Sequence, residues 1–394
     1  MPPKGSEAPS PPPATAPLGL YVHFPFCSVR CTYCDFPTVA GRDDRIAVYI
    51  DTLIREIDGF QPEAAGAVDT IFFGGGTPSR MSPEQADRVL GAIKNRFDVR
   101  DGTEVTLEGN PESLTGDALW GFKDAGVTRI SVGVQSFDDS VLSRVGRAHD
   151  AGQGKRAVSL AREAGFTDVS LDLIAGLPGE RLNAWPETLS QAAALGPDHL
   201  SVYLLESDKD TPLGRAIRGG RTVIAGDDAM AAVYDETVAT LQTAGYQLYE
   251  ISNFARGNRR SRHNLKYWTD APYAGFGLGA HGYVSGERRA NRADLDGYLN
   301  DVAAGVDPAS WREPYDRDRR VEEALFLGLR VVEGVDLTAL GARYDVHLLE
   351  RHAEAWERGT AAGLIAWEGA RVFLTAEGRV RSNALFAELL GDPA

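Results

Sequence analysis

Three cysteines lie within eight residues of one another, at Cys27, Cys31 and Cys34, in the pattern Cys-x3-Cys-x2-Cys. Three thiolates on one short loop can hold three irons of a [4Fe–4S] cluster. The fourth iron then has no protein ligand, so it can bind a small molecule. Two other interpretations stay open: a structural zinc ion, whose fourth ligand would be a nearby histidine, and inert buried thiols. A disulfide scaffold is excluded, because such scaffolds need more cysteines and an even number.

A second group of residues that could do chemistry stands where β-rich segments end. The run Gly74–Thr77 follows one segment, and its glycines allow the backbone to approach a ligand closely. Carboxyl or amide side chains stand at or near the ends of the next three segments, at Glu108, Gln135 and Asp172. A polar group at the end of an apolar strand must be paired inside the protein or must face a ligand. Four such strands predict one shared polar site, although a structural hydrogen bond explains any single residue equally well.

The elements that must position these residues form a repeated pattern over the first 215 residues. Six β-rich segments, starting roughly 25 to 50 residues apart, alternate with helical ones; they cover residues 20–24, 70–73, 104–108, 129–134, 168–174 and 200–205. Such spacing is typical of parallel βαβ units. Six units are two short of a complete (βα)8 barrel, so the pattern predicts a partial, splayed (βα)6 barrel with an opening for a large substrate. An open doubly wound sheet is the alternative.

The composition changes along the chain and predicts four regions. Residues 1–17 form a Pro-rich, disordered tail, and residues 18–215 form the partial barrel. Residues 216–315 connect the barrel to a small α+β, winged-helix-like domain over residues 316–394. In that last region two helical segments precede a hairpin at Glu368-Gly369-Ala370. The region is rich in Glu and lacks a basic stripe, so we expect a structural or lid role rather than DNA binding.

The overall charge excludes several classes of partner. The net charge is −15, from 41 Lys and Arg against 56 Asp and Glu. Nucleic acid and anionic membranes both require clustered basic residues, so neither is expected as a partner. No apolar run approaches the roughly 18 residues of a membrane span, and the N-terminus lacks the apolar core of a secretory signal. The expected location is the cytoplasm.

The cysteine motif, with the aromatic Tyr33 before its last cysteine, resembles the signature of the radical S-adenosylmethionine (SAM) superfamily. The resemblance implies that SAM chelates the open iron through its amino and carboxylate groups. It also implies that an electron from the cluster can cleave SAM to a 5′-deoxyadenosyl radical.

Over about residues 18–300 the chain is similar to one branch of that superfamily, the anaerobic coproporphyrinogen III oxidase-like proteins. The similarity begins in Tyr-Val-His-Phe-Pro-Phe-Cys at Tyr21–Cys27 and continues weakly to the end. Only this resemblance indicates a binding role for Arg147. Its sequence context alone would predict a solvent-exposed helix residue. The resemblance implies eight SAM-binding residues: Tyr21, Gly75, Gly76, Thr77, Glu108, Gln135, Arg147 and Asp172.

Two functions compete within the branch. The oxygen-independent coproporphyrinogen III oxidase converts two propionates to vinyls by radical decarboxylation. Its motif usually has a further cysteine two residues after the third, where this sequence has Phe36, and a long N-terminal extension, where this sequence has only the Pro-rich tail before Tyr21. The other function is that of the haem chaperones, which bind haem and transfer it to acceptor haemoproteins, including respiratory ones.

The run Arg262–Trp268 favours the chaperones, because it resembles their H-N-x-x-Y-W signature. The resemblance implies that His263 binds haem, as a neutral imidazole on the iron beside aromatic surface from Tyr267 and Trp268. Plain packing is the alternative for His263, and His281 is a weaker second candidate. We therefore predict a haem chaperone, leave catalysis open, and keep the decarboxylase as the alternative. A different radical SAM enzyme and a metal-binding scaffold without SAM are further possibilities.

Overall fold

The computed structural model describes residues 16–61 and 66–389 of the chain. Apart from its last two residues, the predicted tail over residues 1–17 lies outside this part. Among the described residues, no helix is both long and apolar enough to cross a membrane.

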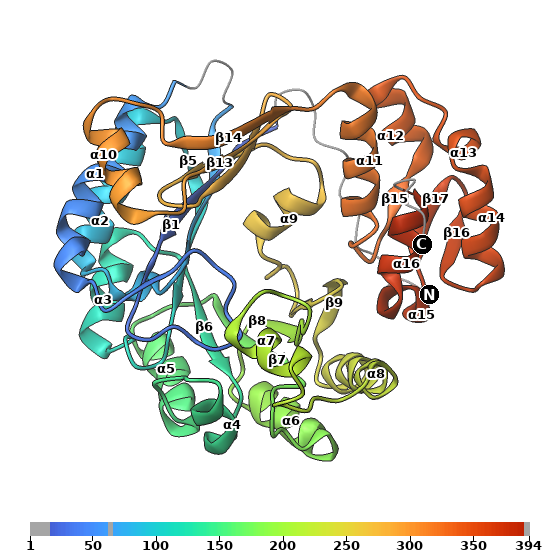
Figure 1. Ribbon diagram of the computed structural model, residues 1–394, viewed down its shortest axis with the longest axis horizontal. Coiled ribbons are helices and arrows are strands. Elements are labelled where there is room, and N and C mark those ends of the chain that lie inside the picture. Colours follow the sequence, from blue (N-terminus) through green and yellow to red (C-terminus); the bar gives the residue numbers. More distant parts are fainter. Residues whose placement is uncertain (1–15, 62–65, 390–394) are drawn as a thin grey trace.

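Six parallel, neighbouring strands form the centre of the large sheet, and they are the six that the sequence predicts. They are β1 (Leu18–Phe24), β4 (Val68–Gly75), β5 (Val99–Gly109), β6 (Arg129–Gln135), β7 (Val169–Ala175) and β8 (His199–Leu204). Helices cover the outer, convex side of this curved sheet (Figure 1). The predicted partial barrel is therefore confirmed.

Further strands extend the sheet on both sides of this centre, and all of them come from beyond residue 215. They are β9 (Gln247–Glu250), β10 (Asn253–Ala255), β11 (Tyr273–Phe276), β12 (His281–Val284), β13 (Glu287–Asn291) and β14 (Ala309–Pro314). The complete order is β14-β13-β12-β11-β1-β4-β5-β6-β7-β8-β10-β9, so β14 and β9 are the edges. β11 runs parallel to β1, and the other added strands pair antiparallel. The division of the chain at residues 215 and 315 stays a prediction, but the sheet itself continues past residue 215.

The outer helices present apolar stripes to the sheet. They are α1 (Ile46–Gly59), α2 (Pro83–Arg96), α3 (Gly116–Ala125), α4 (Asp139–Arg144), α5 (Ala151–Glu163), α6 (Trp185–Ala194), α8 (Asp227–Thr243) and α10 (Leu295–Ala303). In α1 the buried face includes Ile50, Leu53 and Ile57, one helical turn apart. α2 begins with the predicted capping box, in which the Ser82 hydroxyl accepts from the Gln85 N–H at 3.2 Å and the Gln85 side chain accepts from the Ser82 N–H at 2.9 Å.

Short elements complete the barrel region. They are β2 (Phe26–Cys27), β3 (Val39–Ala40), η1 (Asp43–Arg45), η2 (Pro78–Arg80), η3 (Leu182–Ala184), α7 (Pro212–Arg218) and α9 (Arg262–Trp268). α9 differs from the outer helices because it lies on the inner side of the sheet (Figure 1).

The C-terminal residues form a separate small fold with its own core. Its helices are α11 (Arg317–Gly328), α12 (Leu337–Tyr344), α13 (Leu348–Arg351), α14 (Ala353–Ala361), α15 (Ala376–Val380) and α16 (Ser382–Leu389). Its three-stranded sheet contains β15 (Val335–Asp336), β16 (Ile365–Glu368) and β17 (Arg371–Leu374). The hairpin of β16 and β17 lies where the sequence predicts it, and α11 and α12 correspond to the two predicted helical segments. α13 and α14, which lie between α12 and the hairpin, were not predicted. Leu325, Trp356 and Val372 are buried in the apolar cluster between these elements.

Two glycines in helices give a matched test of the packing between α2 and α3. A Cβ atom at Gly121 in α3 would lie 2.5 Å from Pro83 at the start of α2, whereas a Cβ atom at Gly91 in α2 would meet no described atom within 4 Å. We expect Gly91→Ala to raise the free energy of unfolding by about 0.5–1 kcal/mol, because alanine loses less backbone entropy in a helix. Gly121→Ala should lower it by roughly 1–3 kcal/mol, because the helices must move apart. Denaturation followed by circular dichroism measures both, and equal effects would contradict the packing.

Candidate functional site

The cysteine loop lies at the C-terminal end of β1, in contact with the loops that follow other strands. Cys27 is the last residue of β2, which follows β1 after one residue and pairs with β3. The Thr32 N–H donates to the Val145 carbonyl at 3.0 Å, and the Thr32 carbonyl accepts from the Leu213 N–H at 2.8 Å. These bonds hold the loop between the segment after α4 and the start of α7. Cys27 is buried, and Cys31 and Cys34 are partly exposed.

The sulfur atoms have neighbours that suit thiolates. The Thr77 hydroxyl lies 3.5 Å from Cys27 Sγ, and Arg147 Nη1 lies 3.7 Å from Cys31 Sγ. Burial raises the pKa of the Cys27 thiol and raises the pKa of Cys34 to about 11. Both thiols are therefore protonated at neutral pH without a metal, and iron would have to displace the protons. The hydroxyl and the guanidinium would then help to stabilise the charge on the sulfurs.

A zinc site would need a fourth ligand, and the nearest histidine in sequence is not free to provide it. His23 is buried; its Nδ1 lies 3.1 Å from the Tyr21 hydroxyl and its Nε2 lies 2.9 Å from the Pro37 carbonyl. Within the described part of the chain, no group of three His, Cys, Asp or Glu side chains is arranged to hold a single metal ion. A cluster does not require such convergence, since each thiolate binds a different iron.

The glycine run at the end of β4 packs directly against the end of β1. Gly75 has φ of +108°, and a Cβ atom there would lie 2.5 Å from the His23 ring. A Cβ atom at Gly76 would lie 2.5 Å from the Pro25 backbone. Only glycine fits either position without displacing β1. The Gly75 N–H donates to the Glu108 carboxyl at 3.3 Å, so the run also links β4 to β5.

Two carboxyl groups face each other across the inner side of the sheet. The register pairs Glu108 with Ser131, and the Ser131 hydroxyl donates to the Asp172 carboxyl at 3.0 Å. Burial, and then repulsion from Asp172, raise the pKa of Glu108 to about 8. Burial also raises the pKa of Asp172, against hydrogen bonds from Ser201 and Ser131 that lower it. A pair of this kind is costly without a positive charge nearby, and a sulfonium or ammonium group would supply one.

Gln135 and Arg147 complete the group. Gln135 has φ of +66°, which is uncommon for a residue with a side chain, and its buried Oε1 has no hydrogen-bond partner among the described residues. Arg147 Nη2 donates to the Asn110 side chain at 2.7 Å and to the Gly133 carbonyl at 2.6 Å. Asn110 Nδ2 in turn donates to the Thr77 hydroxyl at 3.2 Å. Sequence reasoning did not assign Asn110 to the site, although its place two residues after Glu108, just beyond a strand end, was a usable signal.

The eight residues predicted to bind SAM thus meet at one end of the barrel. Tyr21 is the last of them; it is in register with Phe72 on the neighbouring strand, and burial raises its pKa, with Glu108 adding to the effect. Two carboxyl groups, an unpaired amide oxygen and a glycine-lined turn suit a ligand that carries a sulfonium and an amino group. The residues therefore fit SAM, and their binding of SAM stays a prediction.

His263, predicted to bind haem, lies on α9, where it contacts Thr70 near the start of β4. Its side chain is fully buried, with Nδ1 2.9 Å from the Thr70 hydroxyl and Nε2 3.0 Å from the Tyr267 hydroxyl. Its ring stacks on Phe72 with centroids 5.3 Å apart. Glu104 accepts from the His263 backbone N–H at 3.1 Å and so fixes the start of α9. Haem ligation by His263 stays a prediction, and in this geometry it requires one of the two ring hydrogen bonds to break.

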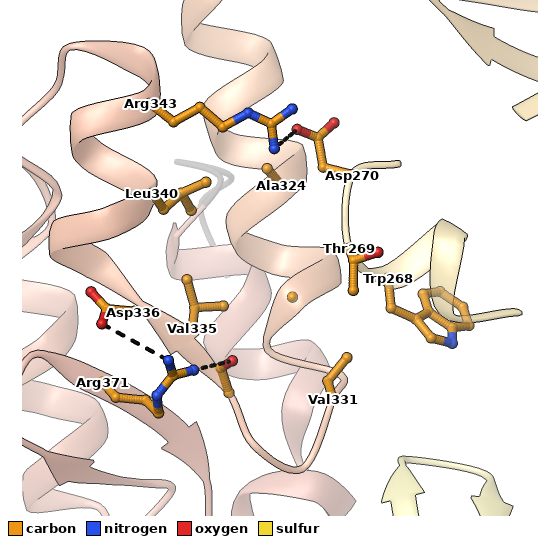
Figure 2. Close-up of a pocket in the computed structure, with 12 residues that line it drawn as sticks. Trp268, Thr269, Asp270, Ala324, Val331, Val335, Asp336, Leu340, Arg343 and Arg371 are labelled. Atoms are coloured by element: carbon orange, nitrogen blue, oxygen red, sulfur yellow. Dashed lines mark hydrogen bonds and ion pairs between the residues drawn. The ribbon is translucent and has the colours of Figure 1, made fainter. Parts of the chain in front are cut away.

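The end of α9 joins the barrel to the C-terminal fold. The Arg330 guanidinium lies over the Trp268 ring, 4.5 Å from its centroid, and Asp270 forms an ion pair with Arg343 at 3.0 Å. A cavity of about 60 Å³ lies between Trp268, α11 and α12 (Figure 2). That volume holds about two water molecules, so this cavity does not hold a porphyrin. Trp268 therefore has a clear packing role, whatever else it does.

Comparison with known proteins identifies two family models and several similar proteins. Residues 21–192 match the family model described as the Radical SAM superfamily, and residues 315–381 match the HemN C-terminal domain. The chain is 33% identical over 374 residues to "Heme chaperone HemW" of Bacillus subtilis, a match that covers 94% of this chain and 99% of that protein. The chain belongs to the HemW family of radical SAM proteins.

Other members of the HemW family and a solved structure extend the comparison. The HemW protein of Mycobacterium tuberculosis strain H37Rv is 34% identical over 385 residues, covering 95% of each chain. Among solved structures, coproporphyrinogen III oxidase (HemN) from Escherichia coli is 25% identical and superimposes with a TM-score of 0.83 over 95% of this chain and 90% of that one. Membership of the radical SAM superfamily implies a [4Fe–4S] cluster and SAM as cofactors.

The raised pKa of Glu108 predicts a pH-dependent effect of Glu108→Gln on stability. Between about pH 5 and 8 the folded chain keeps a proton on this carboxyl that the unfolded chain has lost, so the group lowers stability as the pH rises. Glutamine removes this effect. We expect the stability of the variant relative to wild type to increase by about 1–2 kcal/mol between pH 5 and pH 8. Denaturation curves of the cluster-free proteins at both pH values test this; a difference that does not change with pH would contradict it.

Replacement of the two candidate haem histidines should affect stability very differently. His263→Ala leaves the Thr70 and Tyr267 hydroxyls without their shared partner and opens a cavity beside Phe72. We expect it to lower the free energy of unfolding by about 2–4 kcal/mol. His281→Ala, at an exposed position, should change it by less than about 0.5 kcal/mol. Equal effects in thermal denaturation would show that α9 does not need His263.

Proposed function

We propose that this chain is a haem chaperone that binds haem and a SAM-coordinating [4Fe–4S] cluster, and that transfers haem to acceptor haemoproteins, respiratory ones among them. The observation that carries the proposal is the match to HemW proteins named as haem chaperones, which runs over 94–95% of this chain. The cytoplasmic location expected from the sequence stays a prediction.

Cys27, Cys31 and Cys34 would hold the cluster, and the eight residues around the glycine turn would hold SAM. The cluster, when bound, supplies a single electron at its open iron. Glu108 and Asp172 would offset the positive charge of SAM, and the backbone at Gly75 and Gly76 allows close approach. Arg147 lies beside Cys31 and donates a hydrogen bond to the Asn110 side chain, so it would link the cluster to the SAM site.

The oxygen-independent coproporphyrinogen III oxidase is the second candidate, and the likeness to E. coli HemN over nearly the whole chain favours it. Phe36 weighs against this function. Its exposed ring occupies the position, two residues after Cys34, where the decarboxylase usually has a further cysteine. A phenyl ring can provide neither a thiol proton nor a metal ligand.

The proposal predicts a stable haem complex and SAM-dependent changes at the cluster. After anaerobic reconstitution with iron and sulfide, we expect haemin to give a shifted Soret band at one haem per chain. SAM should change the electron paramagnetic resonance spectrum of the reduced cluster. The Cys31→Ser variant should lose the cluster signal, while its circular dichroism spectrum should match that of the wild type because the fold is unchanged. Transfer is measured by mixing the haem-loaded protein with an apo-haemoprotein and following the acceptor's spectrum.

Three results would contradict the chaperone function. Failure of the reconstituted wild type to form a haem complex would remove it directly. Formation of vinyl-bearing product from coproporphyrinogen III, with SAM and a reductant, would favour the decarboxylase instead. Purification with zinc in place of iron would remove both functions.

A further inference from the structure

We propose that His281, rather than His263, is the histidine that ligates haem iron, at the end of the barrel that carries the cysteine loop. This inference rests on the proposed haem chaperone function and assigns the iron ligand within it. It depends on which histidine nitrogens are free, where His281 lies and which way its side chain faces.

Most of the seven histidines contact other residues of the protein through their ring nitrogens. His23, His199 and His263 are each at most 2% exposed, and both ring nitrogens of each one form hydrogen bonds. His149 is 5% exposed, with Nε2 bonded to the Val134 carbonyl and Nδ1 3.5 Å from the Glu112 carboxyl. An imidazole needs a free nitrogen to ligate iron, so these four would have to break internal contacts.

Three histidines remain, and only one of them lies near the candidate site. His347 and His352 belong to the C-terminal fold, on either side of α13, and the His352 ring packs edge-on against Trp356. His281 is the first residue of β12 and is exposed, and its ring forms no hydrogen bond with any residue that the structure describes.

The loop before His281 packs on the cysteine loop. β11 pairs with β1 so that Phe276 lies beside Val22, which places the following residues at the same end of the barrel as the cysteines. A Cβ atom at Gly277 would lie 2.5 Å from the His23 carbonyl, and one at Gly279 would lie 2.7 Å from the Pro37 ring. His281 is thus two residues from a contact with the segment that follows Cys34.

The strand register also fixes the face on which His281 stands. Tyr273 and Tyr283 are paired across β11 and β12, and side chains two residues apart on a strand share a face. His281 therefore shares the face of Tyr283 and Tyr273. Gly275, which pairs with Tyr21, lies on that same inner face. A Cβ atom at Gly275 would lie 2.1 Å from the His281 carbonyl, so the backbone of His281 packs closely on β11 at this point.

The surroundings suit an iron porphyrin. Phe36, next to Pro37 on the cysteine loop, is 57% exposed and offers apolar surface at the same rim. The cavity beside Trp268 is too small to compete as a haem site.

The test is a haem titration of four proteins with ultraviolet-visible and electron paramagnetic resonance spectroscopy: wild type, His281→Ala, His263→Gln and His347→Ala. We expect wild type to show histidine-ligated haem. His281→Ala should lose that spectrum and bind haem at least tenfold more weakly, and added imidazole should restore the spectrum. His347→Ala removes an exposed histidine elsewhere and should behave as wild type. His263→Gln keeps a side chain able to bond Thr70 and Tyr267, and should also keep the wild-type haem spectrum.

The outcomes separate the inference from the function on which it rests. If wild type binds no haem, the proposed function is wrong. If wild type binds haem and His281→Ala keeps the same spectrum and affinity, the function stands and the assignment of His281 is wrong. Loss of the spectrum in His263→Gln alone, with unchanged thermal stability, would return the ligand to α9.

Discussion

The site depends on one geometric constraint: parallel strands all end at the same side of a sheet, and alternate residues along each strand face the same way. β1 and β4 to β8 therefore bring the cysteine loop, the glycine turn and the residues at the ends of the next three strands to one rim. Fully buried apolar residues such as Val22 and Leu107 face the outer helices. The alternate positions on each strand face the inner side and can carry polar groups. A shift of one residue in any strand would turn these polar groups into the apolar core.

This rim holds polar groups in unfavourable surroundings. Glu108 is a partly buried carboxyl held near Asp172, and Gln135 has a left-handed backbone and an unpaired buried oxygen. Near α9, Glu104 and His263 are fully paired. Folding stability alone favours the second arrangement, so the first is better explained by a ligand that supplies positive charge and a donor. The radical SAM family membership is consistent with that interpretation.

The H-N-x-x-Y-W sequence forms α9, where its residues have a structural role that the sequence alone does not indicate. His263 and Tyr267 pack against the inner side of the sheet, while Trp268 and Asp270 contact the C-terminal fold through Arg330 and Arg343. A motif can therefore characterise a family because its residues connect two parts of the fold. The motif therefore supports membership of the family. It does not by itself identify the iron ligand, because a ligand needs a free ring nitrogen at an accessible position.

The sequence by itself determined the six central strands, the helical stripe of α1, the capping box of α2 and the C-terminal hairpin, because local periodicity and turn chemistry encode each of them. It also indicated which residues end those strands, and the motifs identified the family. Only the tertiary structure decided that short strands after residue 215 extend the sheet, since strands of three to six residues, such as Glu287–Asn291, carry no clear alternation. It alone placed Asn110 between Thr77 and Arg147, buried His263 and left His281 exposed. Burial and pairing arise from segments distant in sequence, so no local pattern records them.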